Sequence, residues 1–253
     1  MTLTTEHVSV TIVLPTYNRM KFLSEAITSV LSQSFLDFKL IIIDDGSTDE
    51  SARLIQSFND KRITYLYQEN RGEYAATNVG LRKVQSKYFT WIHSDDIWPE
   101  DSLKLRVEWL QGHPDADLVH GDIAKIDEHG SVLATLQGTQ LSSGEVLKTY
   151  CTEYYPALLQ GVPPPFLTHH TTFLMRRPLL DVVGYFDESL PHAGDFDWML
   201  RALHVSSITY LPKLLYLYRR HVGTKTVSDE KQHDTKAVVK EILDRHCPIS
   251  VRL

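Results

Sequence analysis

The first half of the chain alternates short apolar runs with amphipathic segments, and this alternation restricts the fold more than any other feature of the sequence. The apolar runs predict strands at Val8–Leu14, Leu40–Ile43, Ile63–Tyr67 and Tyr88–Ile92. The segments that follow them have the periodicity of helices, at Met20–Gln33, Asp49–Phe58, Tyr74–Val84 and Asp101–Gln111. Pro15 is expected to end the first strand. This order predicts an α/β fold with a mostly parallel, Rossmann-like central sheet flanked by helices.

The second half is less regular. It predicts a hairpin from Leu118–Ile126 and Val132–Leu136, a strand at Thr171–Met175, and helices at Phe196–Leu203 and about 229–246. Tyr154–Thr168 contains three consecutive prolines and is expected to be a long loop. We therefore expect a smaller region of mixed structure after the parallel half.

Composition restricts the class of protein. With 253 residues, 42% of them hydrophobic, the chain is long enough to bury one large core. The net charge is −6 and no basic run occurs, so a nucleic-acid partner is not expected. Cys151 and Cys247 show no zinc-site spacing and are expected to be buried free thiols in a reducing compartment. Neither a signal peptide in the polar Met1–His7 segment nor a membrane-spanning run is expected, which predicts a cytoplasmic protein.

Polar clusters follow the predicted strands at Pro15–Arg19, Asp44–Ser47 and Ser94–Asp96. Because ligands bind at the carboxyl ends of parallel strands, these clusters are expected to converge on one crevice. The acids of Asp44–Ser47 suit a base or ribose contact, although these four residues alone favour a turn with a helix cap. Asp95 and Asp96 are hard oxygen ligands suited to Mg²⁺ or Mn²⁺, and a polar loop is an equal alternative for them.

Other candidates are weaker when each is taken alone. Arg71 near a helix start suits a phosphate, but a surface arginine is the commoner case. Asp195 is a candidate general base, or else a capping or first-turn acid at the start of a helix. Adjacent histidines on a strand point apart, so His169 and His170 are not expected to chelate a metal together. His170, which follows the long loop, is expected to face an acceptor site.

Taken in order, these segments resemble family 2 of the inverting glycosyltransferases, which have the GT-A fold. The resemblance spans about residues 8–221 and includes a similarity to the spore-coat polysaccharide glycosyltransferase type. The matching pieces are VTIVLPTYNR, IIIDDGSTD, ENRGEYAATNVGLRKVQSKYFTWIHSDD, FDESLPHAGDFDWMLRAL and a late YRRH. No QxxRW signature occurs, which argues against a processive membrane synthase.

The resemblance implies a role for each matched residue. The implied nucleotide-sugar contacts are Pro15, Thr16, Tyr17, Arg19, Asp45, Arg71, Asn78, Ser94 and Asp95. The metal, Mn²⁺ or Mg²⁺, would be held by Asp96, with His221 as a further contact, and Asp195 would be the catalytic base. Gly194, Trp198 and His170 are expected on the acceptor side. Two positions depart from the commoner family pattern, because His93 and Gly194 stand where many members have an acid.

We therefore expect a GT-A domain over residues 6–222, with a nucleotide-binding half (6–112), an acceptor-binding half (113–222) and a helical tail (223–253). The expected reaction moves a sugar from a nucleoside-diphosphate donor, UDP or TDP favoured, to a hydroxyl acceptor with inversion. The acceptor would be a saccharide or glycolipid in polysaccharide or glycolipid synthesis, with peripheral association at the inner face of the membrane left open. A sugar nucleotidyltransferase and a non-catalytic sugar-nucleotide-binding protein are the alternatives. The sequence does not indicate an oligomeric state.

Overall fold

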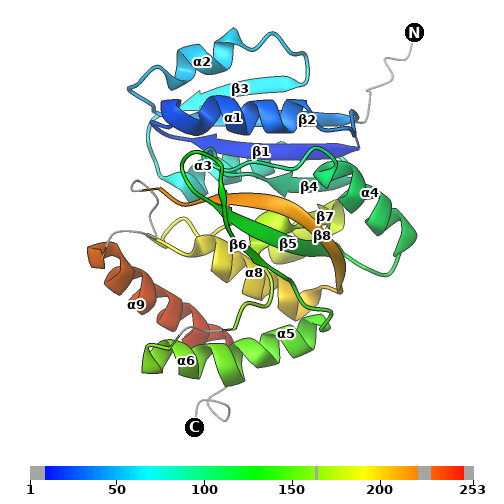
Figure 1. The fold of residues 1–253 in the computed structure, drawn as a ribbon, viewed down its shortest axis with the longest axis vertical. Helices are drawn as coiled ribbons and strands as arrows, with labels where there is room; N and C mark the ends of the chain where they lie inside the picture. The colour runs from blue at the N-terminus through cyan, green and yellow to red at the C-terminus, as the bar shows by residue number, and fades with distance from the viewer. Residues whose placement is uncertain (1–8, 163–164, 222–228, 248–253) are drawn as a thin grey trace.

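One eight-stranded sheet organises the computed structural model, which describes residues 9–162, 165–221 and 229–247 (Figure 1). The strands are β1 Val10–Thr16, β2 Phe38–Asp45, β3 Ile63–Gln68, β4 Tyr88–Trp91, β5 Leu118–Ile126, β6 Val132–Leu136, β7 Leu174–Arg176 and β8 Ile208–Arg219. Their order is β3-β2-β1-β4-β7-β5-β6, and β8 pairs with the other side of β5. The first four strands are mutually parallel, whereas β7 runs antiparallel to both β4 and β5.

Helices cover both faces of this sheet. They are α1 Met20–Leu31, α2 Ser51–Ser57, α3 Glu73–Leu81, α4 Ser102–Gly112, α5 Ser143–Thr149, α6 Tyr155–Gln160, α7 Arg177–Val183, α8 Gly194–Val205 and α9 Asp229–His246. Apolar residues of α1 and α4 pack with β1 and β2 on one face, and those of α3, α8 and α9 form the core on the other. In Figure 1, α5, α6 and α9 lie together at the end of the molecule opposite α2. The predicted α/β class with a mostly parallel sheet is therefore confirmed.

The expectation that Pro15 ends the first strand is wrong. β1 continues to Thr16, and Pro15 lies opposite Ile43 of β2. On its other side β1 pairs with β4, whose last paired residue lies opposite Val13. Pro15 therefore has a partner strand on one side only, where a missing N–H is tolerated. The extra residues carry the strand to the edge where the polar clusters gather.

The expected loop at Tyr154–Thr168 is wrong in its first part. Helix α5, a π-helical turn (η1, Tyr150–Tyr154) and α6 follow one another without a break, and within the expected loop only residues 161–162 and 165–168 are described as irregular. A capping box between Ser142 and Glu145 starts this helical stretch. The wider π turn comes just before Pro156, which lacks the N–H that a regular helix would use there. Residues 163–164 lie outside the described part of the chain.

The expected strand at Thr171–Met175 is also only partly right. His170–Thr172 form a 3₁₀ turn, η2, and the strand β7 begins at Leu174. His169 and His170 therefore do not alternate across a strand, and their rings stack with centroids 4.5 Å apart. Helices α5 and α7 have no counterpart among the predicted elements.

The expectation of two free thiols is wrong as well. Cys151 in η1 and Cys247 after α9 form a disulfide, with Cα atoms 5.4 Å apart and a sequence separation of 96. Both residues are buried, as expected. The predicted reducing compartment loses the support that it drew from free thiols.

Candidate active site

A cavity of about 680 Å³ opens at the carboxyl ends of β1, β2 and β4. The parallel half contributes the loops after these strands, and the second half contributes η1, the 165–171 segment and the start of α8. The predicted residues that line the cavity are Pro15, Thr16, Tyr17, Arg19, Asp45, Ser94, Asp95, Asp96, His170 and Asp195. The three polar clusters therefore do converge on one crevice.

The loop after β1 forms one side of the cavity. The Tyr17 side chain is 45% exposed, so its ring has an open face for a flat ligand. The buried Thr16 hydroxyl has no hydrogen-bond partner among the described residues. Asn18, which the sequence analysis did not select, has φ = 49°, and its Oδ1 accepts from the backbone N–H groups of Thr48 (2.8 Å) and Asp49 (3.3 Å). Asn18 thus joins the loops that follow β1 and β2.

Asp45, at the end of β2, holds the loop that leads into α3. Its Oδ1 accepts from Gln68 Nε2 at 2.6 Å and from the Arg71 N–H at 2.9 Å. Its Oδ2 accepts from the Gly72 N–H at 2.9 Å. A carboxylate has about four acceptor positions, so these bonds leave about one for a ligand. Asp44 has a structural role, because it accepts from Ser47 N–H and Tyr65 O–H.

Several predicted residues do not line the cavity. The Asn78 side chain is buried and hydrogen-bonds the backbone of Phe186 and the carboxylate of Glu188. Arg71 pairs with Glu188 at 3.2 Å, at the surface. Trp198 is fully buried, and its Nε1 donates to the Gly184 carbonyl. These side chains fix the segment before α8 to α3, to the loop before α3 and to α8 itself.

The predicted metal motif follows β4 at Ser94–Asp96. Asp96 is 1% exposed, and its two oxygens accept from Tyr216 O–H at 2.8 Å and from the Arg219 N–H at 2.7 Å. Burial, followed by the charge of Asp95, raises the pKa of Asp96 to about 7. Asp95 Oδ2 lies 3.0 Å from His221 Nε2 and 3.9 Å from Arg19 Nε. Asp95 is therefore the carboxylate that lies within reach of His221, whereas both oxygens of the buried Asp96 already accept hydrogen bonds.

Opposing effects set the ionisation of Asp95. Burial acts to raise its pKa, but the hydrogen bond from His221 and the charges of His93 and Arg19 outweigh burial and lower it. Asp95 is therefore ionised and suited to a cation.

The Arg219 guanidinium, which the sequence analysis did not select, organises this edge. Its Nε donates to the Asp95 carbonyl, Nη1 to the Glu128 carbonyl and Nη2 to the Glu25 carboxylate. The side chain is fully buried and lies over the ring of Phe22. Only the YRRH motif in the sequence pointed to this region.

Asp195 lies on the second-half side of the cavity, in the first turn of α8. Ala193, with φ = 56°, is the N-cap of the helix, so Asp195 is a first-turn acid and not the cap. Its Oδ2 lies 3.0 Å from His170 Nε2. Burial acts to raise the pKa of Asp195, but the charge and hydrogen bond of His170 and the charge of His93 lower it far below its usual range.

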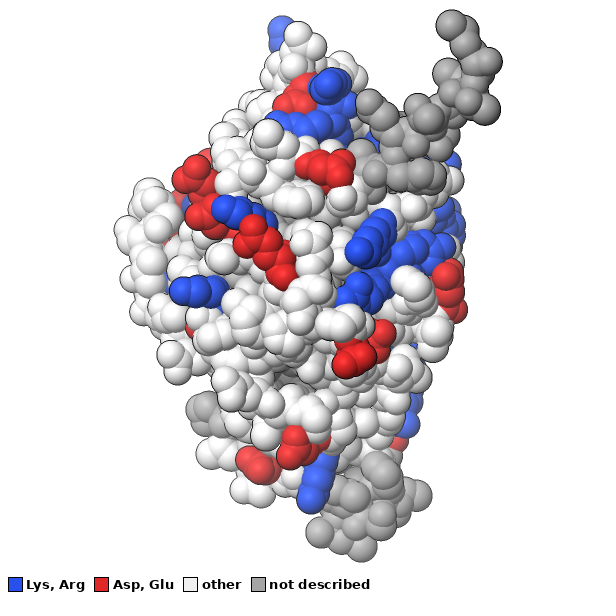
Figure 2. All heavy atoms as spheres, turned by 90° about the vertical axis from the view of Figure 1, so that its right-hand side faces the viewer, with Lys and Arg blue, Asp and Glu red and all other residues white. Residues whose placement is uncertain are grey.

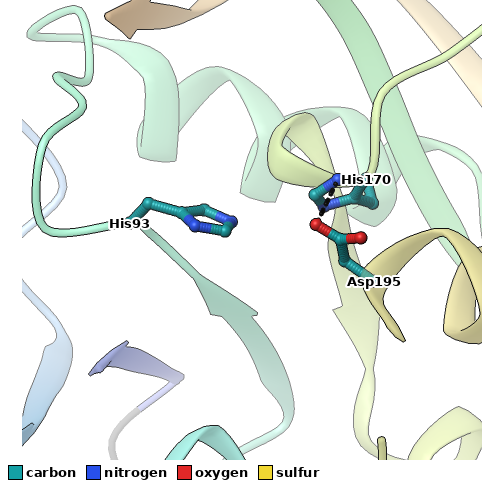
Figure 3. A group of neighbouring side chains, drawn as sticks. All are labelled: His93, His170 and Asp195. Carbon is teal, nitrogen blue, oxygen red and sulfur yellow. Dashed lines mark ion pairs between the residues drawn. The ribbon is translucent and has the colours of Figure 1, made fainter. Parts of the chain in front are cut away.

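His93 faces this pair from the end of β4 (Figure 3). Its Nδ1 lies 3.0 Å from Glu73 Oε1. Burial acts to lower the pKa of His93, but the hydrogen bond and charge of Glu73, with Asp96 and Asp195, raise it to about 10. In the sequence, His93 stood out only as a departure from an acid, and Glu73 gave no signal. Both residues line the cavity.

The packing around position 194 explains why a glycine stands there. A Cβ at Gly194 would lie 2.8 Å from the ring of Tyr74, which lines the cavity. An acid of the kind common in the family at this position would therefore displace Tyr74. Gly194 itself is buried and does not line the cavity.

Comparison with known proteins decides the family. The family model described as "Glycosyl transferase family 2" matches residues 11–183, more than half of the chain. The chain belongs to this family. Membership favours a glycosyltransferase over the sugar nucleotidyltransferase alternative.

Two curated relatives of the family illustrate the range of similarity. An uncharacterized glycosyltransferase of Rickettsia prowazekii is 32% identical over 86% of this chain and 65% of its own length. Chondroitin synthase of Escherichia coli is 26% identical over 93% of this chain and 33% of its own length. The chain spans about a third to two thirds of the length of the first relatives it matches.

Solved structures of other proteins support the fold. Staphylococcus aureus TarS 1–349 in complex with UDP superimposes with a TM-score of 0.66 at 20% identity, covering 92% of this chain and 65% of TarS. The mannosyltransferase PcManGT of Pyrobaculum calidifontis, in complex with GDP-Man and Mn²⁺, gives 0.63 at 18% identity, covering 93% and 68%. The fold is GT-A, as predicted.

Two surface properties bear on partners. On the face that Figure 2 shows, Lys and Arg side chains lie among Asp and Glu side chains. None of the helices in the described ranges is both long enough and apolar enough to span a bilayer.

Proposed function

We propose that this chain transfers a sugar from a nucleoside-diphosphate donor to a hydroxyl acceptor, with inversion at the anomeric carbon. One observation carries the proposal. A single cavity is lined on one side by the loops of the parallel sheet and on the other by an ionised carboxylate, Asp195. This arrangement suits a donor held by the sheet loops and an acceptor activated from the opposite side.

The nucleotide would lie along Tyr17 and Asp45. The exposed Tyr17 ring suits stacking on a base, and the free acceptor position of Asp45 suits the imide N–H of uracil or thymine. Cytosine has no such donor, so UDP and TDP are the favoured classes. That TarS was crystallised with UDP is consistent with this choice.

The donor set at Asp95 and His221 fits a divalent cation. The carboxylate oxygen and the imidazole nitrogen are 3.0 Å apart, and Asp95 is ionised. An oxygen with a nitrogen suits Mn²⁺ better than Mg²⁺, which prefers oxygen ligands alone. When bound, such a cation neutralises the charge that develops on the leaving diphosphate. Arg219 positions this edge through the Asp95 carbonyl and the Asp96 carboxylate.

Asp195 would act as the general base. As the acceptor oxygen bonds to the anomeric carbon and the bond from that carbon to the diphosphate breaks, the acceptor hydroxyl becomes acidic and passes its proton to Asp195. His170, at 3.0 Å, orients the carboxylate. A single displacement by this route inverts the anomeric configuration.

The test compares Asp195→Asn with Asp181→Asn, a matched change of an exposed acid on α7. We expect Asp195→Asn to bind UDP-sugars with Mn²⁺ as the parent does, by calorimetry, and to lose about 10²–10⁴-fold in turnover. Asp181→Asn should behave as the parent. An active Asp195→Asn protein, or a product that retains the donor's anomeric configuration by NMR, would reject the mechanism. UDP-sugar binding without turnover against any acceptor would favour the non-catalytic alternative.

A further inference from the structure

Three potential metal ligands converge beside the proposed base. His93, His170 and Asp195 each offer one ligand atom, and these atoms lie within 4.8 Å of one another. They come from the end of β4, from η2 and from the first turn of α8. Figure 3 shows the ring of His93 pointing toward the His170–Asp195 pair. None of these residues belongs to the Asp95–His221 pair, so the two donor sets share no ligand.

His93 is already held as a ligand would be. Its Nδ1 is 3.0 Å from Glu73 Oε1, while its Nε2 is buried without a hydrogen-bond partner in the described part of the structure. A histidine that binds a metal through one ring nitrogen nearly always gives the other N–H to a carboxylate or carbonyl. The Glu73–His93 contact has this form, and a cation bound at Nε2 would displace the proton that the raised pKa of His93 keeps on the ring.

The spacing suits a small tetrahedral ion. With metal–ligand distances of about 2.0–2.1 Å, neighbouring ligand atoms in a tetrahedral site lie roughly 3.3 Å apart. The 3.0 Å between His170 Nε2 and Asp195 Oδ2 is close to that value. His93 needs to approach this pair by at most about 1.5 Å, which is within the reach of a side-chain rotation.

We infer that His93, His170 and Asp195 form a second cation site, distinct from the Asp95–His221 edge, that binds Zn²⁺ or a similar transition-metal ion. Two imidazoles and one carboxylate favour Zn²⁺ over Mg²⁺, which takes oxygen ligands. Three protein ligands leave the fourth position open to the cavity.

This site has a consequence for the proposed reaction, and this part of the inference rests on the proposed function. An ion on Asp195 occupies the oxygen that would receive the acceptor's proton. Zn²⁺ is therefore expected to inhibit transfer without displacing the donor. With Mn²⁺ in large excess over Zn²⁺, Mn²⁺ would remain at Asp95 and His221, because neither residue belongs to the second site.

The test measures Zn²⁺ binding directly. Chelator-treated protein is titrated with ZnCl₂ by calorimetry in the presence of excess Mg²⁺. Because Mg²⁺ prefers oxygen ligands, it is expected to bind poorly to the histidine-rich site and to leave it free for Zn²⁺. We expect one tight equivalent in the parent. Glu73→Gln, which keeps the side chain's size, should weaken binding by about 10–100-fold. His170→Ala should weaken it further.

Two matched controls locate the ion. His221→Ala removes the other imidazole site, and His169→Gln changes the neighbouring histidine, which is not a member of the cluster. Both should keep the parent's Zn²⁺ affinity. Thermal unfolding without metal checks that each variant is folded. Co²⁺ in place of Zn²⁺ should give the visible absorption of a tetrahedral site in the parent and lose it in His170→Ala.

The outcomes separate this inference from the proposed function. If Glu73→Gln and His170→Ala bind Zn²⁺ as the parent does, or if His221→Ala alone loses it, the inferred site is wrong. Zn²⁺ binding with the expected variant pattern but no sugar transfer would support the site and reject the function. Sugar transfer by a protein that does not bind Zn²⁺ and is not inhibited by it would support the function and reject the site.

Discussion

Asp96 and Asp95 stand side by side in the sequence, but the structure predicts opposite results when each is changed to alanine. Asp96→Ala leaves two buried donors, the Tyr216 O–H and the Arg219 N–H, without an acceptor. Each unpaired donor costs about 1–3 kcal/mol, or about 2–6 kcal/mol for the two. Alanine also removes the cost of burying a carboxylate, so we expect a loss of about 2–4 kcal/mol in unfolding free energy.

Asp95→Ala removes a side chain that faces the cavity and His221. We expect less than about 1.5 kcal/mol of destabilisation and a loss of Mn²⁺ binding, because the proposed cation contact is gone. Asp96→Asn, which keeps one acceptor oxygen, should fall between the parent and Asp96→Ala in stability.

The assay is urea unfolding followed by tryptophan fluorescence, with Mn²⁺ titrations of each folded variant by calorimetry. The midpoint should fall for Asp96→Ala at an unchanged m-value. An Asp96→Ala protein of parental stability that no longer binds Mn²⁺ would refute the reasoning. It would restore Asp96 as the metal ligand, as the sequence alone suggests.

Three further predictions follow from other contacts. Asp45→Ala should remove any preference for UDP over CDP, measured as Kd by calorimetry, and equal affinities in the parent would reject the base contact. Asp197 is buried, and burial acts to raise its pKa, but pairing with His246 and Arg201 lowers it. Its contribution to stability is therefore present above about pH 4 and is lost as the pH falls through its folded pKa. Asp197→Asn should therefore lose roughly 1–3 kcal/mol at pH 7, and its stability, from urea midpoints across pH, should fall less in acid than the parent's. Cys247→Ser opens a loop of 96 residues and should cost up to about 4–5 kcal/mol in the chain-entropy model, whereas an unchanged urea midpoint under oxidising conditions would show that the bond does not form.

The sequence predicted what depends on local periodicity and on the edge rule for parallel strands. Tyr17, Asp45, Asp95 and Asp195 lie on elements of clear pattern, and all reach the cavity. The strand β1 was misjudged at Pro15 because the tolerance of proline depends on where its neighbour β4 ends, which is a property of the sheet and not of the segment.

Long-range pairing accounts for most of the remaining differences. Asn78 is engaged by Glu188, 110 residues away, and the two cysteines are 96 residues apart. The pairing of Glu73 with His93 depends on how closely α3 approaches the end of β4. Such contacts have no signature in spacing or composition, so a single sequence does not reveal them.

The contacts of the Arg219 guanidinium limit how the loops of this glycosyltransferase can be replaced by engineering. One rigid, planar group fixes a loop after β4, the turn between β5 and β6, and helix α1 at the same time. A lysine would keep the positive charge but present a single nitrogen to three separate acceptors. The three segments therefore depend on one another through this arginine and can be exchanged only as a unit. Grafting a foreign loop after β4 is expected to fail unless its arginine and all three acceptors are transplanted together.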